Sequence, residues 1–89
     1  MTNKTLTKTA KRKILFDQTC QYITTLGFDG PHDDDGYGRI NFFKGNTFLE
    51  LQRSSMTVCT DEHLGGTAYD TTKIESFIEN QKVALDLNI

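Results

Sequence analysis

The sequence predicts an α+β domain in which two helices pack on one face of a three- to four-stranded antiparallel sheet. Three observations support this fold class: a helical pattern over residues 9–26, strand-like alternation over 38–60, and a second helical pattern that begins at Thr72. With 89 residues the chain has room for one hydrophobic core. Residues 1–89 are therefore predicted to form a single α-β-β-β-α domain, with residues 1–8 as a frayed basic N-terminal segment.

The first helix is predicted over residues 9–26, because its apolar residues recur at spacings of three and four and so share one face. Gly27 follows as a residue that can take a positive φ angle at a helix end, and Phe28 can fold back on the last turn. The basic residues before Ile14 lie in line with this apolar stripe. Because cations are not expected in the core, we expect the first turn either to project beyond the rest of the domain or to be frayed. The stripe comprises Ile14, Leu15, Tyr22, Ile23 and Leu26.

Residues 38–60 are predicted to form a β-meander. Gly45-Asn46 is a favourable two-residue hairpin turn, and a second turn is placed at Ser54-Ser55. The resulting pairs are Phe43 with Phe48, Phe42 with Leu49, Ile40 with Leu51, Leu51 with Val58, and Glu50 with Cys59.

The two registers agree on which side chains share a face, since side chains alternate along a strand. Two amphipathic helices need an apolar surface, so both are expected on the apolar face of the meander. The opposite face, called the outer face here, stays open and carries Phe43 and Phe48 as a cross-strand pair. The inward residues are Ile40, Phe42, Leu49, Leu51, Met56 and Val58, and the outward ones are Arg39, Asn41, Phe43, Phe48, Glu50, Gln52, Thr57 and Cys59.

The second helix is predicted from Thr72, where Thr72-Lys73-Ile74-Glu75 fits the capping-box pattern. We expect the helix to fray between Asn80 and Asp86. A short edge strand around residues 67–69 would supply the fourth strand. The apolar stripe of this helix is Ile74, Phe77, Ile78 and Leu85, with Glu75 and Glu79 turned outward.

The net charge of −2 is unevenly distributed. The first thirteen residues hold five basic side chains and no acidic one, whereas the rest of the chain has five basic and twelve acidic side chains, a net charge of −7. An acidic body therefore follows a basic head. The basic head comprises Lys4, Lys8, Lys11, Arg12 and Lys13.

Cysteine content and hydropathy indicate the compartment. Cys20 and Cys59 are too few for a disulfide scaffold, and no secretory signal pattern follows the charged N-terminus. No apolar run approaches the roughly 18 residues that a membrane span needs. We therefore expect a reduced cytoplasmic protein without membrane contact.

The segment DGPHDDDGYGR, residues 29–39, is the most suggestive of a metal site. A calcium loop of the EF-hand type needs oxygen ligands at positions 1, 3 and 5, glycine at 6 and glutamate at 12. With Gly36 at position 6, Pro31 falls at position 1 and Phe42 at position 12, so the two most demanding ligands are missing. The segment is instead predicted to be a solvated turn that connects helix to sheet.

The remaining candidates for metal binding or catalysis also lack a motif. Cys20, Cys59, His32 and His63 match no zinc spacing. Ser54 or Cys59 could pair with His63, but no nucleophile elbow or oxyanion motif accompanies them. The sequence therefore predicts no metal, no cofactor and no enzymatic activity.

Two features favour binding to another macromolecule. Phe43 and Phe48 expose more apolar surface than a solvated sheet face requires. The acidic side chains could imitate the phosphates of a nucleic acid and steer the protein to a basic groove. The predicted partner-binding residues are Asp33, Asp34, Asp35, Tyr37, Arg39, Phe43, Phe48 and Glu50.

Two alternatives stay open. The basic head could bind phosphate backbones and make the protein a small nucleic-acid-binding regulator, although no aromatic residue is interleaved among its cations. Alternatively, the basic N-terminal segment or a second copy of the chain could cover Phe43 and Phe48, and a second copy would give a homodimer through the outer sheet face.

The chain resembles the small acidic inhibitor proteins of bacteriophages and mobile elements, anti-CRISPR proteins among them. The resemblance lies in size and in the order of helix, acidic loop DDDGYGR, hairpin INFFKGNTFLEL, third strand and acidic helix YDTTKIESFIEN. It implies non-catalytic inhibition in the host cytoplasm, by occupying a protein or nucleic-acid-binding groove on a larger complex such as a CRISPR effector. It assigns no role to individual residues, and the basic head differs from a pure nucleic-acid mimic.

Overall fold

The computed structural model describes residues 6–32, 38–60 and 69–87. These residues form an α+β fold with a four-stranded antiparallel sheet in the order β1-β2-β3-β4, which confirms the predicted class. The elements are α1 (Lys8–Thr25), β1 (Asp29–His32), β2 (Arg39–Lys44), β3 (Thr47–Gln52), β4 (Thr57–Thr60) and α2 (Thr72–Ala84).

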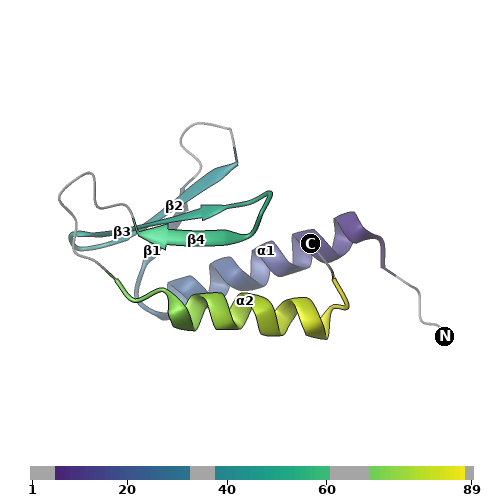
Figure 1. The fold of residues 1–89 in the computed structure, drawn as a ribbon. Coiled ribbons are helices and arrows are strands. Elements are labelled where there is room, and N and C mark those ends of the chain that lie inside the picture. Colours follow the sequence, from purple (N-terminus) through teal and green to yellow (C-terminus); the bar gives the residue numbers. More distant parts are fainter. Residues whose placement is uncertain (1–5, 33–37, 61–68, 88–89) are drawn as a thin grey trace.

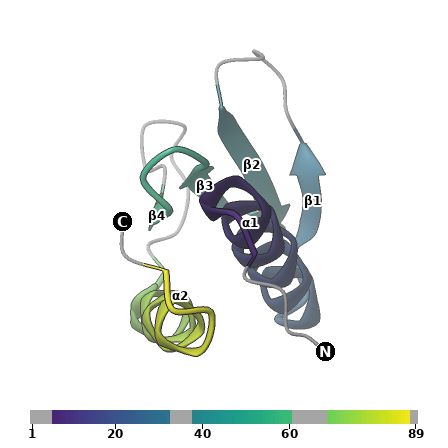
Figure 2. The same ribbon diagram turned by 90° about the vertical axis from the view of Figure 1, so that its right-hand side faces the viewer.

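Both helices lie on the same side of the sheet, as predicted (Figure 1). The core lies between the two layers and includes Leu15 and Ile23 of α1, together with Ile74 of α2, all fully buried. The helices also contact each other directly, since the rings of Tyr22 and Phe77 stack with their centroids 4.4 Å apart. Seen along the helices, α1 and α2 lie side by side beneath the strands (Figure 2). The predicted inward residues Ile40, Phe42, Leu49, Leu51, Met56 and Val58 are all buried.

The predicted strand registers are confirmed. Phe43 pairs with Phe48 across the Gly45-Asn46 turn, and Leu51 pairs with Val58 in the second hairpin. The second turn is longer than predicted, because the ladder ends at the pair of Gln52 with Thr57 and leaves residues 53–56 as the loop. Met56 is therefore buried from a turn position with a φ of 54°, and not from a strand.

The sequence prediction for residues 29–32 was wrong, because these residues form β1 and are not a solvated turn. Pro31 lacks an N–H group, but a strand at the sheet edge needs hydrogen bonds on only one side. Gly30 approaches the ring of Phe42 so closely that an added Cβ would lie 2.8 Å from its Cδ2 atom. The fourth strand is therefore β1; of the predicted edge strand at 67–69, Tyr69 is not in a strand and the rest lies outside the described residues.

The first helix begins at Lys8, and its N-terminal end projects beyond the sheet (Figure 1). The Thr7 hydroxyl accepts a hydrogen bond from the Ala10 amide at 3.0 Å and so caps the helix. The Lys11 amine donates to the carbonyl oxygen of Asp86 at 3.1 Å, which ties this end to the segment after α2. The first of the two predicted arrangements, a basic turn that projects, is therefore the one observed from Lys8 onward.

The start of α2 differs from the predicted capping box. Thr71 is the N-cap residue, and the Thr72 amide donates to the carboxylate of Asp70 at 3.0 Å. The Thr72 hydroxyl also donates to that carboxylate, so both hydrogen bonds lower the pKa of Asp70. Glu75 accepts from the Thr71 hydroxyl, one residue earlier than predicted. The Thr72 amide thus donates to Asp70 instead of the predicted Glu75 carboxylate, and the Glu75 amide donates to the Thr71 carbonyl oxygen instead of the Thr72 hydroxyl.

Candidate functional site

Three aromatic rings lie together on the outer face of the sheet. The His32 ring stacks on Phe43 with centroids 5.0 Å apart and planes 15° apart, and Phe43 lies 6.5 Å from Phe48. Phe43 is 37% exposed, which is high for a large apolar side chain. We call His32, Phe43 and Phe48 the aromatic cluster. It spans β1, β2 and β3, and both helices pack on the opposite face of the sheet (Figure 1).

A bulge in β1 brings His32 to this face. Asp29 pairs with Phe43 and His32 with Asn41, so Gly30 and Pro31 of β1 together oppose the single residue Phe42 of β2. Without the bulge, Asp29 and His32 would point to opposite faces, because their positions differ by an odd number. In the structure they share the outer face, and the Asp29 carboxylate lies 3.4 Å from Nε2 of His32.

The strands also place the predicted polar residues beside the cluster. Glu50 is partly buried and accepts a hydrogen bond from the Gln52 side-chain amide at 3.1 Å. Arg39 is exposed at the start of β2, opposite Gln52. Arg39, Phe43, Phe48 and Glu50 are thus brought to one face. The other predicted partner-binding residues, Asp33, Asp34, Asp35 and Tyr37, lie outside the described residues.

The basic head does not form one continuous cationic stripe over its described part. Lys11 is engaged by the carbonyl of Asp86, and Lys13 forms an ion pair with Asp17 at 3.1 Å. Lys8 and Arg12 are exposed on α1, and Lys4 lies outside the described residues. A stripe that tracks a phosphate backbone would need these charges side by side and unneutralised.

The two described cysteines have different environments. Cys20 is buried on α1, and burial raises the pKa of its thiol to about 11, so it stays protonated near neutral pH. Cys59 is exposed on the outer face, opposite Glu50. Within residues 6–32, 38–60 and 69–87, no group of three or more metal-ligating side chains could hold a metal ion. His63 lies outside these ranges.

Sequence reasoning missed His32 as a member of the aromatic cluster. Alternation along β2 and β3 identified Phe43 and Phe48, but β1 was not expected to be a strand. The only signal was Gly30-Pro31, which marks an irregular backbone and fits an edge-strand bulge as well as a turn.

Comparison with protein-family models, with curated proteins and with solved structures found no match to this chain. The described helices include none with both the length and the apolar character to cross a membrane. The chain's own residues therefore carry the evidence for its function.

Proposed function

We propose that this protein is a non-catalytic binding protein that blocks a groove on a larger protein or ribonucleoprotein complex through its outer sheet face. The aromatic cluster carries this proposal. Aromatic side chains are enriched among the residues that dominate binding energy, and an apolar patch on an open face marks a contact surface. The stack of His32 on Phe43 also holds the rings in place before binding, which lowers the entropy lost on association.

Charge around the cluster favours a basic partner. The Asp29 carboxylate is 70% exposed and lies beside His32, and Glu50 lies on β3, the strand that also carries Phe48. The chain after the basic head has a net charge of −7. Complementary charge speeds association and selects the partner, while the buried rings supply the affinity. The partner surface is therefore a basic groove with an apolar pocket that accepts the rings.

Many basic grooves on large complexes hold nucleic acid. An acidic protein that occupies such a groove would exclude the nucleic acid by steric and electrostatic means. The resemblance to phage inhibitors makes a host defence complex, such as a CRISPR effector, the first partner to test. Inhibition of that class would take place in the host cytoplasm and would need no catalytic group.

The test compares three purified proteins as bait in a lysate of cells in which the gene is naturally expressed. The baits are the unmodified chain, the double variant Phe43→Ser with Phe48→Ser, and the control Val83→Ser, since Val83 is 81% exposed on α2. We expect a complex that the unmodified chain and the control capture and the double variant loses. Its affinity should fall at least about tenfold, because hot-spot truncations cost about 2 kcal/mol or more.

Two outcomes would overturn the proposal. Equal capture by all three baits would remove the aromatic cluster from the interface. A concentration-dependent dimer of the unmodified chain that the double variant abolishes, without capture of another protein, would make a second copy of the chain the partner. Melting temperatures of the three baits should agree, which separates loss of binding from loss of the fold.

A further inference from the structure

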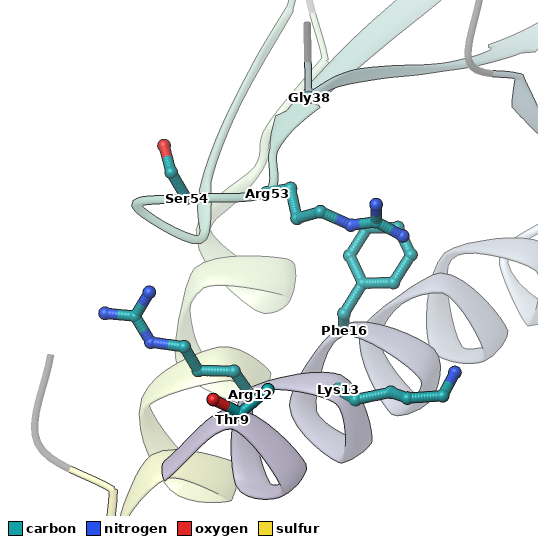
Figure 3. Close-up of a pocket in the computed structure, with 7 residues that line it drawn as sticks. All are labelled: Thr9, Arg12, Lys13, Phe16, Gly38, Arg53 and Ser54. Carbon is teal, nitrogen blue, oxygen red and sulfur yellow. The ribbon is translucent and has the colours of Figure 1, made fainter. Parts of the chain in front are cut away.

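A cavity of about 470 Å³ opens on the helix side of the sheet, where the first turns of α1 approach the turn between β3 and β4. It lies at the end of the β2–β3 hairpin away from the Gly45-Asn46 turn, so it is separate from the aromatic cluster. Its lining residues are Thr9, Arg12, Lys13, Phe16, Gly38, Arg53 and Ser54 (Figure 3). We call this cavity the cationic pocket.

Among the described residues that line this pocket, three are cations and none is a carboxylate. The charge of Lys13 is partly neutralised by its ion pair with Asp17. No described carboxylate lies within ion-pair distance of Arg12 or Arg53. Two guanidinium groups from distant parts of the chain therefore line this cavity, on different sides of it in Figure 3, without neutralising partners among the described residues.

Arg53 is held in place at both ends. Its backbone amide donates to the Gly38 carbonyl at 2.9 Å, and its guanidinium carbon lies 4.3 Å from the centroid of the Phe16 ring. Figure 3 shows the guanidinium over that ring, which belongs to α1. A guanidinium stacked on an aromatic ring keeps its N–H groups available at its edge. The ring and the backbone bond thus fix a planar donor group before any ligand arrives.

The neutral lining groups also suit an anion. The side chains of Thr9 and Ser54 bear hydroxyl groups that can donate to an oxyanion, and Figure 3 shows the Arg12 side chain rising from the helix toward the turn that holds Ser54. Guanidinium groups match the oxygen geometry of phosphate with paired hydrogen bonds. Side chains from α1 and from the β3–β4 turn could therefore contact a phosphorylated molecule from two sides, with its phosphate group at Arg53.

We propose that the cationic pocket binds the phosphate group of a small phosphorylated molecule. The volume falls within the range of about 300–1,000 Å³ that is usual for small-molecule sites. A compact phosphate fits better than a nucleic-acid strand, because Lys11 is already engaged with Asp86 and the acidic body repels an extended polyanion. This site is independent of the outer sheet face and of any protein partner.

Nuclear magnetic resonance titration of the full chain at low salt tests the proposal. The probes are inorganic phosphate, glucose 6-phosphate and adenosine monophosphate, with glucose and adenosine as dephosphorylated controls. We expect the backbone amides of Thr9, Gly38, Arg53 and Ser54 to shift with the phosphorylated probes and to stay in place with the controls. The probe that binds most tightly identifies whether a sugar, a nucleoside or phosphate alone is the preferred source.

Matched variants assign the effect to the pocket. Arg53→Gln should weaken phosphate binding at least about tenfold, since it removes hydrogen bonds between charged groups. Lys73→Gln removes the same charge from an exposed site on α2 and should leave the affinity unchanged. Unaltered melting temperatures would exclude unfolding as the cause of any loss.

Three results would overturn the proposal. These are the absence of localised shifts at millimolar probe concentrations, equal weakening by Arg53→Gln and Lys73→Gln, and tighter binding of a single-stranded oligonucleotide than of adenosine monophosphate. The second would mean that only net charge matters, and the third would assign the pocket to nucleic acid. The experiment uses the purified protein alone, so its outcome does not depend on whether a protein partner exists.

Discussion

The aromatic cluster and the cationic pocket lie at opposite ends of the β2–β3 hairpin and on opposite sides of the sheet. The cluster consists of neighbouring rings on an open sheet face, with Asp29 and Glu50 nearby, which suits the extended surface of another macromolecule. The pocket is concave and presents guanidinium groups, which suits a compact anion. Asp29 and Glu50 lie beside the cluster and cations line the pocket, so a small anion is expected to favour the pocket.

The two regions also differ in what holds them together. Backbone pairing across three strands sets the positions of the rings in the cluster, so a change in the backbone of β1 should disturb it most. Side-chain packing between α1 and the β3–β4 turn sets the pocket, through the contact of Arg53 with Phe16. Side-chain substitutions should therefore alter the pocket while the fold stays intact.

The largest effect is expected from Gly30→Ala, which acts on the bulge that carries His32. An added Cβ would lie 2.8 Å from Cδ2 of the buried Phe42 ring and 2.9 Å from the carbonyl oxygen of Asn41, at a φ of 145°. We expect the free energy of unfolding to fall by about 2–3 kcal/mol, as measured by urea denaturation.

Gly45→Ala is the matched control, because Gly45 has a φ of 60° and no atom within 4 Å of an added Cβ. It should lower the free energy of unfolding by only about 1 kcal/mol, because the left-handed conformation of residue 45 is then the one unfavourable feature. If Gly30→Ala costs no more than Gly45→Ala, the close approach to Phe42 does not shape β1, and the position of His32 has another cause.

The next largest effect is expected at the acidic segment that follows His32. Asp33, Asp34 and Asp35 lie outside the described residues, and the sequence predicts that they steer the protein to its partner. Reversal of all three to lysine should slow association with the captured complex about tenfold and flatten its dependence on salt.

Glu75→Lys combined with Glu79→Lys provides the control for charge reversal on the exposed face of α2. Stopped-flow association at two salt concentrations distinguishes the cases. An equal slowing by both variants would mean that overall charge steers the protein, and no slowing would remove the three aspartates from the mechanism.

A smaller effect is expected from Arg53→Lys in the cationic pocket. Lysine keeps the charge but lacks the planar group that stacks on Phe16 and binds phosphate with two hydrogen bonds. We expect phosphate affinity to fall about fivefold, which corresponds to about 1 kcal/mol, with little change in stability. Titration calorimetry measures the affinity, and an unchanged value would show that charge alone suffices.

Much of the fold could be predicted because local signals agreed with one another. The Gly45-Asn46 turn fixed one register, and alternation then placed Phe43, Phe48 and Glu50 on one face. Residues 29–32 were missed because glycine and proline usually end strands, whereas an edge strand with a bulge accepts both. The position of His32 depends on that bulge. Simple alternation of side chains from Asp29 would place His32 on the inner face, and the bulge places it on the outer face.

The cationic pocket could be predicted only in part. Thr9, Arg12, Lys13 and Phe16 are spaced at three and four residues, so they share one side of a helix. The sequence does not show that this side meets Arg53, because that contact depends on where α1 crosses the sheet. The sequence also predicted a two-residue turn where the structure has a loop at residues 53–56. Arg53 is therefore the first residue of this loop and not the last residue of a strand.

The smallest effect is expected from Arg53→Gln on the pKa of Cys20. The charge of Arg53 lies close enough to this thiol to lower its pKa. The pKa of Cys20 is raised from 9.0 to about 11, mainly by burial and also by the nearby Asp17, while Arg53 partly offsets the rise. The folded protein thus keeps this proton at pH values where the unfolded chain loses it. The stability that this provides is present below about pH 9 and is lost as the pH rises toward 11.

Thiolate absorbance in a Cys59→Ser background measures this titration, within the pH range where circular dichroism shows the fold intact. Arg53→Gln should move the Cys20 midpoint upward, because removal of the cation disfavours the thiolate. Lys73→Gln should leave it in place. A midpoint that does not respond to Arg53→Gln would mean that the guanidinium does not stay over Phe16 in solution, which would weaken the case for a preorganised phosphate site while leaving the aromatic cluster untouched.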